Sequence, residues 1–193
     1  FESERIAKVA FEQAAIRNKK VTAVHKANVF RISDGLFLDS VRNISKDYPD
    51  VDYNEELVDA TAANLIRNSD DYDVIVTTNM FGDILSDEAS EISGSLGIAP
   101  GINFGEKLIV AQAQHGSAPD IAGKNIANPS SLILSFSMML SWIGYKKKNN
   151  SLINCSQLID KSLDSILSDI NLRTKDLGGK LSTNEFTKNL ISV

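Results

Sequence analysis

The sequence has only one cysteine, Cys155, among 193 residues. A single cysteine excludes an intrachain disulfide framework and is typical of a protein from a reducing compartment. We therefore expect a cytoplasmic protein, or one of the mitochondrial matrix if the source is a eukaryote.

Long apolar runs are also missing. No stretch approaches the roughly 20 residues of a membrane-spanning helix, and the most apolar segment, residues 130–143, is interrupted by serines. The net charge of -5 gives no general attraction to nucleic acid or to an anionic membrane. The only basic run, Lys146 to Lys148, predicts a solvated loop between two helices. We expect neither nucleic acid nor a membrane as a partner.

An initiator methionine is absent as well. The chain opens inside an amphipathic pattern with Ile6, Val9, Ala10 and Ala14 on one stripe, which favours a helix entered partway through a longer protein. We therefore expect a fragment, whose targeting segment, if any, lies in the missing part.

Strand and helix patterns alternate through the first half of the chain. Helices are predicted over residues 3–18, 33–46, 60–67 and 82–92, and strands over residues 21–24, 51–57 and 73–78. The last of these strands is a β-branched run typical of a buried parallel sheet. The alternation predicts an α/β fold with right-handed crossovers.

The pattern changes after Ser93. Residues 94–107 are rich in glycine and predict a loop-rich junction, so we expect one domain over residues 1–93 and another over residues 94–193. The second part is predicted to hold a strand at 108–111, a polar loop at 115–128, and helices at 129–144, 152–169 and 183–191. Ser182 or Thr183 would cap the last helix, with Glu185 in its first turn.

Three carboxylates follow predicted strands. Asp83 and Asp87 lie four residues apart at the start of a helix, so both share one face at the carboxyl end of the sheet. Such a pair suits a hard divalent cation, although carboxylates near a helix N-terminus also simply complement the helix dipole. Asp59 is either a third oxygen ligand or an N-cap.

Lys26 directly follows a predicted buried strand. A lysine there is either close to carboxylates, and so tuned for proton transfer, or a side chain that reaches out to solvent.

The polar segment His115–Lys124 contains two glycines and a proline, which let a backbone approach a ligand closely. Asp120 in this loop could accept both hydroxyls of an adenosine ribose and would repel a 2′-phosphate. Many surface loops have a similar composition, and neither GxGxxG nor a Walker motif occurs.

Read together, these segments resemble the β-decarboxylating dehydrogenases, the isocitrate/isopropylmalate dehydrogenase family. The matching stretches, in family order over nearly the whole chain, are Val24–Asn28, Asp34–Phe37, Val58–Ala60, Phe81–Asp87, Gly94–Gly97, His115–Gly123, Ala127–Pro129 and Asp176–Gly179. Several motifs in register are more specific than any one of them.

The resemblance implies an isopropylmalate dehydrogenase-like two-domain fold and NAD-dependent oxidative decarboxylation with Mg²⁺ or Mn²⁺. It makes Lys26 the catalytic lysine with Asp59 as proton relay, and Asp59, Asp83 and Asp87 the metal-site aspartates. Asn28 would lie near the substrate and nicotinamide. The implied cofactor-binding residues are His115, Gly116, Ser117, Ala118, Asp120, Ile121 and Asn128. The resemblance also implies a homodimer or higher oligomer with shared active sites, in which Lys26 and Asp59 come from one subunit and the other two aspartates from its partner.

The chain departs from the family in length, since family members are nearly twice as long. Its six arginines are spread along the chain, without the close pairing that a site for a polycarboxylic acid needs. By the resemblance, residues 1–93 form a small dimerisation domain and residues 94–193 the C-terminal half of a large cofactor-binding domain. We expect the fragment alone to be inactive.

The substrate class is open among hydroxy-polycarboxylic acids. His25 stands where isopropylmalate enzymes usually have Asp, and the stretch Thr174–Gly179 is closer to NAD-isocitrate enzymes, which favours isocitrate or homoisocitrate. The alternatives are 3-isopropylmalate, a tartrate- or malate-type acid, and a noncatalytic regulatory subunit. The presence of both Asp83 and Asp87 disfavours a regulatory subunit.

Overall fold

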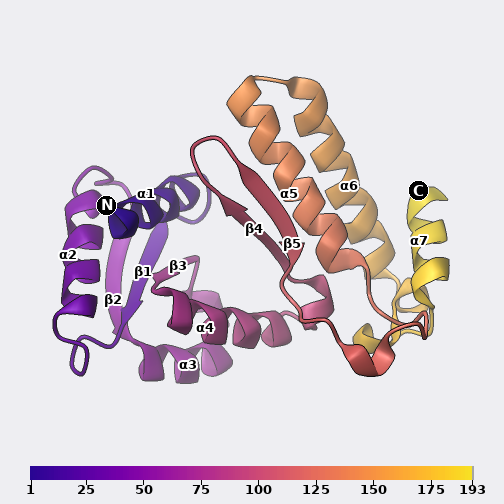
Figure 1. Cartoon of the computed structure of the whole chain (residues 1–193), viewed down its shortest axis with the longest axis horizontal. Helices are drawn as coiled ribbons and strands as arrows, with labels where there is room; N and C mark the ends of the chain where they lie inside the picture. The colour runs from indigo at the N-terminus through magenta and orange to yellow at the C-terminus, as the bar shows by residue number, and fades with distance from the viewer. Residues whose placement is uncertain (193) are drawn as a thin grey trace. The chain divides into compact units, whose positions relative to one another are not determined.

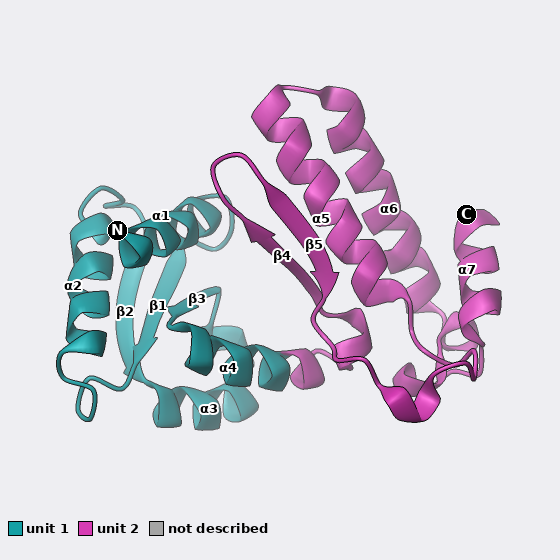
Figure 2. Ribbon diagram, in the orientation of Figure 1, with its two compact units in different colours: residues 1–89 teal, residues 90–193 magenta. Residues whose placement is uncertain are grey.

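The computed structural model describes residues 1–192, and the chain divides into two compact units, residues 1–89 and 90–193 (Figures 1 and 2). The glycine-rich junction predicted a boundary between residues 93 and 94. The observed division falls inside helix α4 (Asn79–Ile92), which begins in unit 1 and ends in unit 2.

Unit 1 is built on a parallel sheet with the strand order β2-β1-β3. The central strand β1 (Lys20–His25) pairs with β2 (Asp52–Leu57) and with β3 (Val74–Thr77). Both pairs are parallel and each strand is followed by a helix, so the predicted α/β architecture is confirmed.

Helices cover both faces of this sheet because successive side chains of β1 point to opposite sides. Val21 and Ala23 pack with Phe11 against helices α1 (Glu2–Ala15) and α2 (Ser33–Ser45). Val24 faces the other way and packs with Leu65 of helix α3 (Val58–Arg67) and with Leu85 of α4. The buried run of β1 therefore fixes the sheet between two helical layers.

Unit 2 contains an antiparallel hairpin of β4 (Pro100–Phe104) and β5 (Ile109–Ala113). The loop predicted for residues 94–107 is wrong at β4. Its sequence is short and contains a proline and a glycine, so local propensity gives no strand signal. Pairing with β5 produces the strand, with Pro100 opposite Ala113 and Phe104 opposite Ile109.

Serines attach helix α5 (Ser130–Lys147) to the hairpin. Ser131 Oγ donates to the carbonyl of Ala99 at 2.5 Å, and Ser135 Oγ donates to the carbonyl of Gln112 at 2.7 Å. Ser135 Oγ also accepts from the Gly101 amide at 3.0 Å. These bonds explain how Ser131 and Ser135 are buried on the hairpin side of α5, since both hydroxyl groups have partners.

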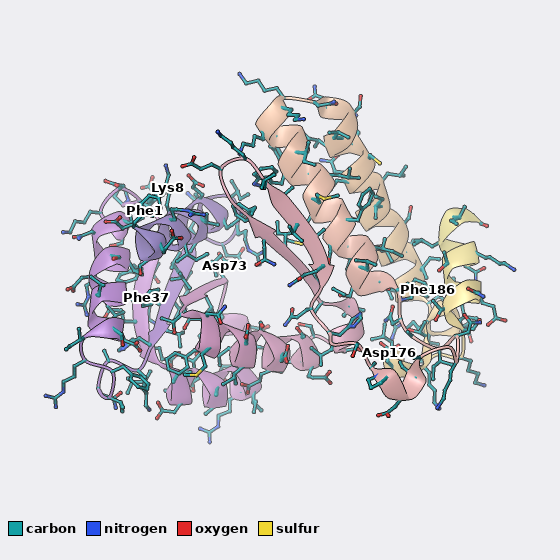
Figure 3. All side chains as sticks on the ribbon, viewed as in Figure 1. Phe1, Lys8, Phe37, Asp73, Asp176 and Phe186 are labelled. Carbon is teal, nitrogen blue, oxygen red and sulfur yellow. The ribbon has the colours of Figure 1, made fainter. Side chains whose placement is uncertain are left out.

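Helices α6 (Asn150–Ser168) and α7 (Thr183–Ser192) complete unit 2, with Leu163, Ile166 and Phe186 at the centre of its core (Figure 3). The predicted cap of α7 is confirmed: Ser182 Oγ accepts from the Glu185 amide at 3.3 Å, and the Glu185 carboxylate accepts from the Ser182 amide at 2.9 Å. Among the described residues, no helix is long and apolar enough to cross a membrane.

The basic run is not a loop, contrary to the prediction. Lys146 and Lys147 form the end of α5, and Lys148 is its C-cap in the left-handed conformation. The Lys146 ammonium lies 4.3 Å from the centre of the Trp142 ring, one turn back on the same helix. Contact with an aromatic face, together with cations at a helix C-terminus, accounts for lysines here.

Candidate functional site

Lys26 and Asp59 meet at one edge of the unit 1 sheet. Lys26 follows β1 directly, and Asp59 lies in the first turn of α3, which follows β2. Because β1 and β2 are parallel neighbours, their carboxyl ends lie side by side. Lys26 Nζ donates to the Asp59 carboxylate, and the lysine side chain is only 23% exposed. Of the two interpretations of Lys26, the structure therefore favours a lysine held by a carboxylate.

Asp59 is not the N-cap of α3, which was one of its two predicted roles. The N-cap is Leu57, which has no side-chain cap, so the Asp59 carboxylate remains available to Lys26. The hydrogen bond from Lys26, followed by a backbone hydrogen bond, lowers the pKa of Asp59. Asp59 is therefore a charged carboxylate at neutral pH, able to accept the hydrogen bond from Lys26.

Asp34 anchors the turn that carries Lys26. It belongs to the stretch Asp34–Phe37 that matches the family, and the sequence alone predicted no site role for it. Asp34 is 5% exposed, and its carboxylate accepts from the Lys26 amide at 2.7 Å. The Val29 amide closes the turn on the Lys26 carbonyl at 2.8 Å. Asn28 lies in this turn with an exposed side chain, close in sequence to Lys26.

Asp83 and Asp87 are both exposed on α4, one helical turn apart. Over residues 1–192, no group of three or more acidic, histidine or cysteine side chains lies close enough to hold a metal ion. Asp59 is therefore not gathered with these two aspartates into a three-carboxylate cluster within one chain. The two carboxylates of α4 fit a hard divalent ion as two of its oxygen ligands.

A cavity of about 610 Å³ lies in unit 2, within the usual volume of a small-molecule site. The polar loop supplies much of its wall, including most of the predicted cofactor residues: His115, Gly116, Ser117, Ala118, Ile121 and Asn128. Asp120 is not part of the wall. It lies on the short 3-10 helix η3 (Pro119–Ile121), between two lining residues, with an exposed side chain.

The start of helix α7 holds this loop in place. The Thr183 amide donates to the Asn125 carbonyl at 3.0 Å, and the Thr183 hydroxyl donates to the Ala127 carbonyl at 2.5 Å. The Asn125 side chain in turn accepts from the Asn184 amide at 3.1 Å. A segment without regular structure thus has fixed backbone positions, which a binding loop requires.

Sequence reasoning gave no site role to several residues that line the cavity. Ser95, Leu96, Gly97 and Asp176 belong to two of the matching stretches, which was the only signal available for them. Burial tends to raise the pKa of Asp176, but hydrogen bonds from Thr174, Asn128 and Ser95 outweigh it and hold that pKa below the usual range. Asp176 is therefore a charged wall residue at neutral pH.

Comparisons with known proteins place the chain in a family. The family model described as isocitrate/isopropylmalate dehydrogenase matches residues 1–190. A 3-isopropylmalate dehydrogenase of Sulfurisphaera tokodaii is 49% identical over 185 residues, covering 96% of this chain and 54% of that protein. A homoisocitrate dehydrogenase of Methanocaldococcus jannaschii is 50% identical over 182 residues, covering 93% of this chain and 52% of that protein.

Among solved structures, an isocitrate dehydrogenase from Methylococcus capsulatus superposes with a TM-score of 0.91 at 39% identity. The match covers 98% of this chain and 55% of that one. The chain therefore spans about half the length of the relatives that it matches.

Proposed function

The chain belongs to the isocitrate/isopropylmalate dehydrogenase family, and on that basis we propose that the polypeptide containing it oxidatively decarboxylates a 2-hydroxy-3-carboxy acid with NAD and Mg²⁺ or Mn²⁺. The observation that carries this proposal is the ion pair between Lys26 and Asp59 at the carboxyl edge of β1 and β2. This edge is where open α/β sheets bind ligands.

Lys26 and Asp59 have the chemistry of a proton relay. In its neutral form, Lys26 Nζ would accept the proton of the substrate hydroxyl as the carbinol carbon loses its hydride. The proton could then pass along the existing hydrogen bond to Asp59, whose side chain is 67% exposed and can release it to water. The Asp34 carboxylate, by fixing the Lys26 backbone amide, would keep Nζ at this position.

The unit 2 cavity is the proposed site of the adenosine half of the dinucleotide. Apolar side chains from Leu96, Ile121 and Ile126 line it beside the backbone of a glycine-containing loop, which suits a planar base and its sugar. When bound, the dinucleotide supplies the hydride acceptor, and a divalent ion supplies positive charge that would polarise the ketone oxygen while the β-carboxylate leaves as CO₂. Asp120 would favour NAD over NADP by repelling a 2′-phosphate.

Asp83 and Asp87 would contribute two carboxylate ligands to the divalent ion, and Asp59 a third from a second copy of the chain. The absence of a three-carboxylate cluster in the described part of one chain supports this division between subunits. Large apolar side chains are exposed on the same two helices: Ile66 of α3 is 71% exposed, and Met80 and Ile84 of α4 are 58% and 60% exposed. Exposed large apolar side chains are favoured at protein–protein contacts, so we propose a dimer through α3 and α4.

The proposed substrate is isocitrate or homoisocitrate. The full-length protein would be assayed with Mg²⁺ and NAD against isocitrate, homoisocitrate, 3-isopropylmalate, tartrate and malate, with NADH and CO₂ both measured. We expect equal amounts of the two products and the highest kcat/KM for isocitrate or homoisocitrate. A preference for another acid would overturn the substrate only, whereas no NADH from any of them would overturn the activity.

A further inference from the structure

The carboxylate of Asp176, a residue labelled in Figure 3, connects segments that are far apart in the sequence. Its Oδ2 accepts from Ser95 Oγ at 2.7 Å and from Asn128 Nδ2 at 3.0 Å. Its Oδ1 accepts from Thr174 Oγ1 at 2.5 Å. Ser95, Asn128 and Asp176 all line the unit 2 cavity, so one carboxyl group holds together three parts of its wall.

Gly97 is fitted to the same group of side chains. A Cβ at this position would lie 2.6 Å from Asp176 Oδ2, 2.9 Å from Asn128 Cβ and 3.1 Å from Ser95 Oγ. The Gly97 amide also donates to Ser95 Oγ at 2.9 Å. Glycine is thus the residue that lets the backbone reach the hydrogen-bonded carboxylate without a clash.

Both ends of the Asn128 side-chain amide are hydrogen bonded. Its Oδ1 accepts from the Ser130 amide at 2.9 Å, and its Nδ2 donates to Asp176. The amide cannot turn over without losing both bonds, because each end then faces a group of its own kind. The orientation of Asn128, and of the backbone beside it in the cavity wall, therefore depends on an acceptor at Asp176 Oδ2.

All the hydrogen-bond donors to Asp176 are neutral groups. None of the ion pairs found within residues 1–192 includes this carboxylate. A carboxylate that accepts hydrogen bonds from several neutral donors holds each donor in a defined direction, because each bond sets the position of one partner. This arrangement suits a group that fixes geometry.

We propose that Asp176 is a positioning residue for the nucleotide pocket: it holds Ser95 and Asn128 in the geometry that binds the dinucleotide, without touching the reacting atoms. The inference rests on the proposed function, since it takes the ligand of the cavity to be the adenosine half of NAD. It predicts an effect on cofactor binding that is separable from the chemical step.

Two variants of Asp176, one truncated and one isosteric, should differ in a defined order. Asp176→Ala removes all three hydrogen bonds. Asp176→Asn keeps an oxygen for Asn128, and the Thr174 hydroxyl can rotate to accept from the new amide. We therefore expect Asp176→Asn to lie between the wild type and Asp176→Ala, whereas a role for the charge alone would make the two variants equal.

The experiment measures NADH binding by fluorescence, and NAD kinetics at saturating hydroxy acid, in the full-length protein. We expect Asp176→Ala to raise the Kd and the KM for the cofactor at least tenfold, with kcat at saturation within about twofold of wild type. Gly97→Ala should act in the same direction. Asp169→Ala, which removes an exposed carboxylate that accepts from the Asn171 amide in the same unit, is the matched control and should bind like wild type.

The outcomes distinguish a wrong cofactor from a wrong role for Asp176. A wild-type protein that binds no NADH would overturn the proposed cofactor, and with it the role of Asp176 in binding a dinucleotide. The positioning role is wrong if wild type binds NADH and both Asp176→Ala and Gly97→Ala bind it with the wild-type Kd. It is also wrong if Asp176→Asn and Asp176→Ala have the same Kd. Should Asp176→Ala fail to fold, the comparison of Asp176→Asn and Gly97→Ala with wild type decides, and an unchanged Kd in both overturns the proposal.

Discussion

Lys26 donates a hydrogen bond to Asp59 across the carboxyl ends of two parallel strands that are neighbours in the sheet but far apart in the sequence. The pairing register brings the last residue of β1, His25, opposite the last residue of β2, Leu57. The residues that follow the two strands are thereby placed within reach of each other. Strand register thus determines which lysine and which carboxylate can share a proton.

The first prediction concerns that lysine. Lys26→Met in the full-length enzyme should lower kcat by about 10²–10⁴-fold, because it removes the proposed proton acceptor while keeping the length of the side chain. The control is Lys46→Met, which removes an exposed lysine of unit 1 that bonds only to Asn43 among the contacts described. Steady-state kinetics decide the matter, and a Lys26→Met enzyme within tenfold of wild type would rule out the role.

The second prediction concerns the divalent ion. Asp83→Asn or Asp87→Asn should lower kcat by at least about 100-fold, since a bound ion contributes several kcal/mol of transition-state stabilisation. Glu88→Gln, on the same helix but on another side of it, should have little effect. Activity would be titrated with Mg²⁺ after EDTA treatment. Wild-type turnover that persists undiminished in EDTA contradicts the assignment.

The third prediction concerns cofactor choice. The wild-type enzyme should have a kcat/KM for NAD at least tenfold above that for NADP, because Asp120 places a negative charge in a loop whose only lysine or arginine is Lys124. Asp120→Lys should narrow or invert that ratio. Glu106→Lys makes the same charge change at an exposed site in the β4–β5 turn and should leave the ratio unchanged. Equal efficiencies with both cofactors in wild type would remove Asp120 from this role.

The fourth prediction concerns acid stability of unit 1. Asp73, only 3% exposed, accepts from Arg17 Nε at 2.9 Å and from the amides of Asn18 and Lys20 (Figure 3). Burial tends to raise the pKa of Asp73, but these hydrogen bonds outweigh it and lower that pKa below its ordinary value. The stabilisation is therefore fully present above the unfolded pKa of about 3.9 and is lost as the pH falls through the folded pKa.

Asp73→Asn should accordingly lower the free energy of unfolding by about 1.5–3 kcal/mol at neutral pH, the range for hydrogen bonds to a charged group. The difference from wild type should shrink at a pH below the folded pKa of Asp73. Urea denaturation followed by circular dichroism at both pH values measures it. Asp70→Asn, at an exposed position nearby in sequence, is the control. If the loss in free energy of unfolding is the same at both pH values, the charge of Asp73 is not the cause of that loss.

The periodic segments of the fold were predictable because burial dictates their pattern. The run Val21 to Val24 is apolar or β-branched, and it forms the central strand with both faces covered. Strand β4 was not predictable, because its short sequence gives no strand pattern and its support comes from pairing with β5 and from contact with helix α5. The helix pattern over residues 60–67 did not settle which of two neighbouring apolar residues is buried: Leu65 is buried and Ile66 is exposed, because helix α3 turns only one of these positions toward the sheet.

Site residues were predictable where they follow strands or lie in glycine-containing loops. The contact of Lys26 with a carboxylate could be anticipated from topology, because parallel strands end at the same edge. The link between Ser95 and Asp176 could not, because no local pattern connects residues so far apart. Likewise, the sequence does not reveal that Asp120 stands outside the cavity wall, since that depends on how Pro119–Ile121 turns.

The central place of β1 also sets the order in which unit 1 can be completed during synthesis. Of the three strands of this sheet, β1 leaves the ribosome before both of its partners, since β2 comes after helix α2 and β3 after helix α3. Until Thr77 has emerged, one edge of a strand with a fully buried apolar run has no native partner. Such non-local pairing is slow and leaves an unpaired strand open to aggregation. Translation pauses upstream of β3 would prolong that interval, and chaperones that bind extended apolar segments would find Val21–Val24 during it.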